Sequence, residues 1–206
     1  VFLVDPIGGP DLAPLWRLRN KPAAEVGAPA ETIQLPSALP TGDERARRIA
    51  AMGWDELRMA VAECRDCRLC EQRKQAVLGV GDVEADWLFV GEGPGAEEDE
   101  RGEPFVGQAG KLLDNMLAAL GMKRGENVYI ANVLKCRPPN NRTPEPPEIE
   151  ACQPYLDRQI ALIGPKLIVA LGKSAATTLL DTDATIASLR GRVHRYRGVP
   201  LVVTYH

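Results

Sequence analysis

Apolar residues along this chain follow two patterns, which predict strands and helices in turn. Short continuous apolar runs predict buried strands at 87–90, 128–133, 167–171 and 201–205. Apolar residues at helical spacing predict helices at 112–120, 149–163 and 174–180. Strands that alternate with helices build a mainly parallel sheet with helices on both faces. We therefore predict an α/β fold, a three-layer α/β/α sandwich with a central, mainly parallel four-stranded sheet.

The N-terminal part of the chain lacks this alternation. Residues 20–40 are rich in Pro and Ala and show no steady apolar period, which is typical of a flexible linker. From Asp43 onward apolar residues return at roughly helical spacing, with Gly53 as a weak point. We expect residues 1–42 to be a flexible Pro/Ala-rich extension and residues 43–206 to be the folded domain.

Composition narrows the class of protein. The length of 206 residues suits one domain with an extension, and 45% hydrophobic residues supply a sizeable core. The formal net charge is −3, so any binding of nucleic acid requires a local basic surface. The sequence contains no apolar stretch that could span a membrane and begins without the basic region of a signal peptide. We expect a cytoplasmic monomer that does not bind membranes.

The cysteines indicate a metal site. Cys64 and Cys67 form a C-x-x-C pair, and Cys136 and Cys152 lie far downstream around a Pro-rich segment. An odd total of five cysteines argues against a disulfide framework. Thiolates from two separate segments are typical of iron–sulfur and zinc sites, and the ligand types alone leave both open. The chain lacks the Cys-Pro pair that would complete a ferredoxin motif with Cys70, so we expect Cys70 to be a spare thiol.

Polar side chains follow the predicted strands. In open α/β sheets, ligands bind beyond the carboxyl ends of the strands. These ends are, in chain order, Gly91–Gly93, Asn132, Gly172 and His206. The carboxylate of Glu92, a carboxamide and an imidazole should therefore converge on one crevice. This set can bind a polar heterocycle, orient a water molecule and stabilise an anion, but it lacks the nucleophile beside a base that acyl chemistry needs.

Two Gly-containing segments resemble phosphate-binding motifs. The run GEGPG at 91–95 fits a dinucleotide fingerprint, but Pro94 interrupts the turn and four acidic residues follow at 97–100. Those acids would repel a pyrophosphate, so we expect no nucleotide cofactor. Gly172-Lys173-Ser174 resembles the end of a phosphate-binding loop, but Leu167 stands where that loop needs glycine.

Four sequence segments, taken together, indicate a family. They are GEGPG (91–95), EEDERGEPFVGQAGKLL (97–113), YIANVLKCRPPNNRTP (129–144) and LIVALG (167–172). In this order they closely resemble the family 4 uracil-DNA glycosylases, the iron–sulfur members of the uracil-DNA glycosylase superfamily. The resemblance extends over residues 54–206. It implies a monofunctional, base-flipping DNA repair enzyme, a hydrolase that cleaves the N-glycosidic bond of uracil in DNA during base excision repair.

The resemblance also implies roles for individual residues. Glu92 and His206 would be catalytic, Glu92 by positioning or activating the hydrolytic water. The residues that would bind the base are Gly91, Gly93, Phe105 and Asn132. Phe105 would stack on the flipped uracil, and Asn132 would read its pyrimidine edge. The family pattern continues after His206 with a P-A-x-L-L-R loop, so we expect its C-terminal part to be missing from this sequence.

The same resemblance favours iron over zinc and DNA as the partner. It implies a [4Fe–4S] cluster whose four ligands are Cys64, Cys67, Cys136 and Cys152. Basic residues just before the Pro-rich segment, within it and near the C-terminus are expected to bind DNA: Lys135, Arg137, Arg142, Arg190 and Arg192.

Two alternatives remain open. The chain could be a non-catalytic iron–sulfur module that binds DNA, or a member of the superfamily branch that becomes crosslinked to uracil-containing DNA. Glu92 in the same crevice as Asn132 and His206 favours the enzyme, because binding alone needs no acid there.

Overall fold

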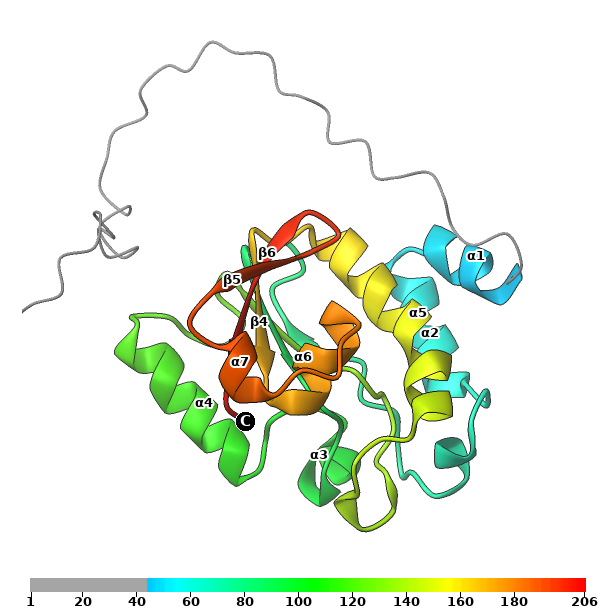
Figure 1. The fold of residues 1–206 in the computed structure, drawn as a ribbon. Coiled ribbons are helices and arrows are strands. Elements are labelled where there is room, and N and C mark those ends of the chain that lie inside the picture. The colour runs from blue at the N-terminus through cyan, green and yellow to red at the C-terminus, as the bar shows by residue number, and fades with distance from the viewer. Residues whose placement is uncertain (1–43) are drawn as a thin grey trace, which may run out of the picture. The chain divides into compact units, whose positions relative to one another are not determined.

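The computed structural model describes residues 44–206 (Figure 1). The predicted extension, residues 1–42, lies outside the described residues, and the proposed domain boundary at residue 43 stays a prediction.

A six-stranded sheet in the order β1-β3-β2-β4-β6-β5 forms the centre of the fold. Its strands are β1 (Val80–Gly81), β2 (Trp87–Gly91), β3 (Val128–Asn132), β4 (Leu167–Leu171), β5 (Val193–Tyr196) and β6 (Val199–Thr204). Strands β3, β2, β4 and β6 are parallel to one another. These are the four strands predicted from the apolar runs, so the mainly parallel core of the sheet is confirmed.

The two edge strands were not predicted, and both are antiparallel to their neighbours. Strand β1 has only two residues, too few to form an apolar run. Strand β5 carries a His and an Arg and has only one fully buried residue. It pairs with β6 through a two-residue turn, Arg197-Gly198, in which both residues have positive φ, as a tight hairpin requires.

Helices flank the sheet. They are α1 (Glu44–Ala51), α2 (Trp54–Glu63), α3 (Ala96–Arg101), α4 (Gln108–Ala119), α5 (Pro146–Ile163), α6 (Lys173–Leu180) and α7 (Ile186–Leu189). Two 3₁₀ segments, Arg68–Glu71 and Pro139–Asn141, lie in the connections. The predicted weak point at Gly53 separates α1 from α2. None of the helices within residues 44–206 is long and apolar enough to cross a membrane.

The core has two main parts, one on each face of the sheet. Alternate residues of β2 point to opposite faces, so Leu88 joins one cluster and Phe89 the other. Helices α5 and α6 pack on the Leu88 side, and α4 packs on the Phe89 side (Figure 1). This arrangement confirms the predicted three layers.

Strand register decides what meets at the carboxyl edge of the sheet. Gly91 at the end of β2 pairs with Asn132 at the end of β3. On the other side, Leu171 of β4 pairs with Thr204 of β6, two residues before His206. The segments that leave these four strands therefore start side by side.

Candidate active site

A pocket of about 470 Å³ lies at the carboxyl edge of the parallel strands. Its lining includes four residues that the sequence singled out, from four separate segments: Glu92, Phe105, Asn132 and His206. Gly93 also lines the pocket, and Gly91 lies directly against two of these side chains. The structure thus brings together all six residues predicted for catalysis and base binding.

Asn132 presents an unsatisfied acceptor at this site. The residue is only 2% exposed, and its amide oxygen Oδ1 is buried without a hydrogen-bond partner in the described part of the chain. Such a buried orphan is costly unless a ligand satisfies it. Gly91 makes the arrangement possible, because a Cβ at residue 91 would lie 2.6 Å from that oxygen and 2.5 Å from the Phe105 ring.

Phe105 belongs both to the core and to the pocket lining. It is a buried member of the cluster under α4, and its ring centroid lies 5.5 Å from that of His206. Its φ of +56° is in the left-handed region, which costs a non-glycine residue roughly 1–3 kcal/mol. Arg124 supports this conformation by donating from Nη2 to the Phe105 carbonyl over 2.7 Å.

Glu98 supports the same loop, and the sequence reasoning missed it. Its carboxylate accepts the backbone N–H groups of Val106 at 2.9 Å, Gly107 at 3.0 Å and Gly95 at 3.1 Å. Burial alone would raise the pKa of Glu98, but these N–H donors outweigh burial and hold the pKa below its usual value. Glu98 also lines the pocket. Its position three residues after Gly95, at the start of α3, is a capping-box signal that could have found it.

Glu92 is held at both its backbone and its side chain. Its carbonyl accepts the N–H of Leu134 over 3.0 Å, which fixes the residue against the segment that leaves β3. Its carboxylate oxygen Oε2 accepts a hydrogen bond from the Ser174 hydroxyl at the start of α6.

Three of the predicted DNA-contacting arginines make local contacts. Arg142 lines the pocket and donates to both carboxylate oxygens of Glu148, over 2.9 and 2.6 Å. Arg137 donates to the Asn141 side chain over 2.7 Å. Arg190 places its guanidinium 4.0 Å from the Tyr205 ring centroid.

Arg190 and Arg192 are both exposed, so a phosphate can reach them.

Lys135 is the predicted contact that the structure places elsewhere. It is only 1% exposed, and its ammonium donates to the Asn132 carbonyl over 2.7 Å and to Gln159 Oε1 over 2.6 Å. Burial lowers its pKa to about 7. Enclosed in this way, Lys135 cannot contact a phosphate, so we correct the prediction and remove it from the DNA-binding set.

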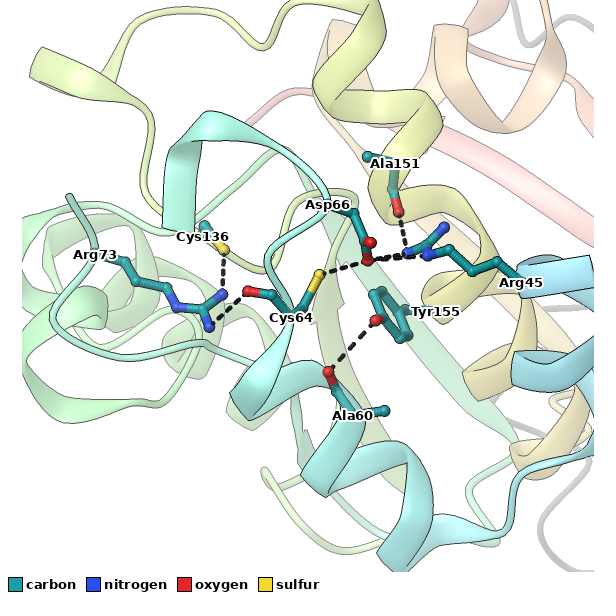
Figure 2. A network of polar contacts seen from close by, with 8 residues as sticks. All are labelled: Arg45, Ala60, Cys64, Asp66, Arg73, Cys136, Ala151 and Tyr155. Carbon is teal, nitrogen blue, oxygen red and sulfur yellow. Dashed lines mark hydrogen bonds and ion pairs between the residues drawn. The ribbon is translucent and has the colours of Figure 1, made fainter. Parts of the chain in front are cut away.

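The cysteines gather beside this interior region. Cys136 and Cys152 are buried in one core cluster and Cys67 packs against it, whereas Cys64 packs against a neighbouring cluster. Figure 2 shows Arg73 between two of their segments, where it donates to Cys136 Sγ over 2.9 Å and to the Cys64 carbonyl over 3.1 Å.

A second set of contacts in Figure 2 ties the helices to this region. Cys64 Sγ donates to Asp66 Oδ2 over 3.0 Å, and Arg45 of α1 bonds both Asp66 and the Ala151 carbonyl of α5. Segments far apart in sequence therefore meet around the thiols.

The chemistry of these thiols fits a metal cofactor, and they lie near enough to influence one another's pKa: Cys67 and Cys64 act on Cys136, and Cys136 acts on Cys152. Burial raises the pKa of Cys152 to about 12 and also raises those of Cys136 and Cys67, so free thiolates are disfavoured there. Within residues 44–206, no three His, Cys, Asp or Glu side chains are placed so that they could hold a metal ion. The four sulfurs nonetheless supply the soft donors, from two sequence segments, that a cluster needs.

The fold and the pocket first define a class of protein. This is an α/β protein with a pocket at the carboxyl edge of its sheet that is lined by both polar and apolar residues, suited to a flat heterocycle that lies against a ring and a carboxamide. Residues 78–206 match the family model described as Uracil DNA glycosylase superfamily. Together with the relatives described next, this match shows that the chain belongs to the uracil-DNA glycosylase superfamily and groups with its type-4 members.

Several relatives bear the same name. A type-4 uracil-DNA glycosylase of Archaeoglobus fulgidus is 47% identical over 160 residues, which cover 74% of this chain and 80% of the relative. One from Pyrobaculum aerophilum is 45% identical over 163 residues, covering 75% and 83%. One from Thermotoga maritima is 46% identical over 148 residues, covering 71% and 77%.

Proposed function

We propose that this chain is a monofunctional uracil-DNA glycosylase, which hydrolyses the N-glycosidic bond of uracil in DNA and releases the free base. The observation that carries the proposal is the pocket in which Glu92, Phe105, Asn132 and His206 meet. Membership of the superfamily supports the same activity. A base inside a duplex is out of reach of such a pocket, so the uracil must be flipped out of the stack.

The first task of the site is to recognise the base. The Phe105 ring offers a stacking face, and base stacking on an aromatic ring contributes roughly 1–3 kcal/mol. The unpaired Oδ1 of Asn132 can accept from uracil N3–H while the amide nitrogen donates to O4. Cytosine presents the reversed pattern at these two positions. The carboxamide therefore selects uracil over cytosine.

The second task is to stabilise the charges that form as the bond breaks. The sugar gains oxocarbenium character, and the leaving uracil gains negative charge. The Glu92 carboxylate favours the sugar cation and positions the attacking water. His206, whose ring lies beside Phe105, is placed to stabilise the uracil anion.

The third task is to hold DNA at the mouth of the pocket. Arg142 lines the pocket, and Arg137 belongs to the same segment after β3. Arg190 and Arg192 supply exposed positive charge near β5. We propose that these four arginines contact phosphates and give affinity without sequence preference.

We further propose that Cys64, Cys67, Cys136 and Cys152 hold a [4Fe–4S] cluster. Bound there, the cluster would clip the loop after α2 to the Pro-rich segment after β3 and so fix the arginines of that segment. Its role would be structural, because the residues proposed for bond cleavage lie in the separate pocket.

We also propose that the protein acts as a monomer in the cytoplasm.

An oligonucleotide with a single uracil tests the proposed activity. The protein should release free uracil and leave an abasic strand that breaks only after alkali. Strand cleavage without alkali would instead indicate a lyase. Binding without uracil release would favour the DNA-binding module, and a covalent adduct would favour the crosslinking branch.

A further inference from the structure

The turn Gly172-Lys173-Ser174 joins β4 to the first residues of α6, at the carboxyl edge of the sheet where the pocket lies. The sequence excluded it as a phosphate-binding loop, and the proposed reaction leaves it without a role. Its last residue, Ser174, nevertheless reaches the central carboxylate of the site: the hydroxyl donates to Glu92 Oε2.

This hydrogen bond controls the orientation of the carboxylate. A glutamate side chain otherwise rotates about its terminal bond, and only some orientations direct an oxygen toward an attacking water. With Oε2 held by Ser174, Oε1 stays available as an acceptor in the pocket. The hydroxyl is not needed to cap α6, whose N-cap position is Gly172 and whose cap has no side-chain hydrogen bond.

The other end of the turn accommodates the second catalytic group. Gly172 has a φ of +87°, and a Cβ at this position would lie 2.7 Å from the His206 Cβ. Its N–H donates to the Thr204 carbonyl over 2.9 Å, which joins the turn to the segment that carries His206. Ser174 thus contacts Glu92, and Gly172 contacts the segment that carries His206.

We propose that Ser174 is a positioning residue, which acts on uracil excision by holding the Glu92 carboxylate in its productive orientation. This inference rests on the proposed function. Ser174 acts through Glu92 alone, so its removal should slow the chemical step and leave DNA binding unchanged.

The test is a double-mutant cycle on single-turnover uracil release. Ser174→Ala should lower the rate about tenfold, the effect of losing a hydrogen bond to a charged group, with DNA affinity unchanged within about twofold. Ser174→Thr keeps the hydroxyl and should restore most of the rate. In a Glu92→Ala background, Ser174→Ala should have no further effect on the residual rate, because the group it orients is gone.

Ser188→Ala in α7 is the matched control and should behave as wild type in the same assay. Equal losses from Ser174→Ala in the wild-type and Glu92→Ala backgrounds would overturn the inference, as would an unchanged rate in Ser174→Ala. Either result with an active wild type leaves the proposed function standing. Absence of uracil release by the wild type would overturn the proposed function and this inference with it.

Discussion

At the residue scale, the site depends on buried polar groups held in fixed directions. The backbone carbonyl of Asn132 accepts a hydrogen bond from the buried Lys135 ammonium, which also donates to the side chain of Gln159. Gln159 in turn donates to the Leu78 carbonyl over 3.0 Å. These bonds fix the backbone of Asn132, and the carboxamide that it carries can distinguish two bases that differ only in the direction of their hydrogen bonds.

Asn132→Asp should therefore weaken the discrimination of uracil from cytosine. The substitution replaces the amide donor with a second acceptor, which repels uracil O4. We expect the ratio of uracil to cytosine excision rates to fall by about 10- to 100-fold, as the loss of one or two hydrogen bonds implies. Rates on matched uracil and cytosine oligonucleotides measure this ratio. Asn115→Asp, on the exposed face of α4, is the control, and an unchanged ratio in Asn132→Asp would contradict the assignment.

Some residue positions were predictable and others were not. Glu92, Asn132 and His206 follow apolar runs, so the strand pattern alone placed them at one edge of the sheet. Lys135 follows the same strand as Asn132, but its burial depends on Gln159, 24 residues away on α5. No local pattern reports such a partner, and an interior lysine is rare enough that a surface role was the natural expectation.

At the element scale, the loop between α3 and α4 forms one wall of the pocket. Glu98 joins the start of α3 to Val106 and Gly107, and Phe105 lies between these segments in a left-handed conformation. The ionised Glu98 carboxylate therefore holds this loop together with Arg124, which donates to the Phe105 carbonyl.

This arrangement makes the stability of the loop depend on pH. The pKa of Glu98 in the folded protein lies below its ordinary value of 4.5, so its contribution is fully present above pH 4.5. The contribution is then lost as the pH falls through the lowered folded pKa. Glu98→Gln should lower the free energy of unfolding at neutral pH by on the order of 1 kcal/mol and reduce its acid dependence below pH 4.5. Denaturant unfolding at several pH values checks this, and parallel curves for the two proteins would contradict it.

The Pro-rich segment between β3 and α5 should depend on its proposed metal cluster for order. Cys136→Ala should remove the cluster, lower the melting temperature and weaken DNA binding together, because losing a structural metal unfolds the segment it holds. Cys70→Ala is the matched control and should keep the iron content, the brown colour and the fold. Metal analysis and thermal unfolding provide the readout. Loss of colour in Cys70→Ala, or one zinc and no iron in the wild type, would show that the ligand assignment is wrong.

Helices and strands could be predicted from the sequence where their residues are buried along most of the element. Strands β2, β3 and β4 are buried over nearly their whole length because helices cover both faces of the sheet. Strand β5 lies at an edge with two exposed residues among its four, and α3 carries the six residues AEEDER, so neither has an apolar pattern to detect. Their places are set by the hairpin turn and by the Glu98 cap.

At the scale of the whole molecule, a chain with a net charge of −3 is proposed to bind a polyanion. The proposed contacts must therefore be local. Affinity that depends on phosphate contacts falls linearly with salt concentration in a log–log plot.

Replacing Arg190 and Arg192 together with Gln should reduce the salt dependence of DNA binding. Each phosphate contact contributes about one unit to the slope, so the double substitution should lower it by about two. Fluorescence anisotropy across a salt series measures the slope. The same substitution of Arg47 and Arg58, on α1 and α2, should leave it unchanged. A slope that does not change in the Arg190 and Arg192 variant would mean that these arginines only face solvent.

The most direct test of the proposed activity compares wild type with Glu92→Ala on one uracil-containing duplex, following both DNA binding and the release of free uracil. We expect the wild type to release uracil with the backbone intact. We expect Glu92→Ala to bind with similar affinity but to turn over about 100-fold more slowly, since the carboxylate acts on the developing charge of the sugar and on the water. Equal losses of binding and turnover in Glu92→Ala, or full activity in that variant, would contradict the central claim that this pocket performs the excision.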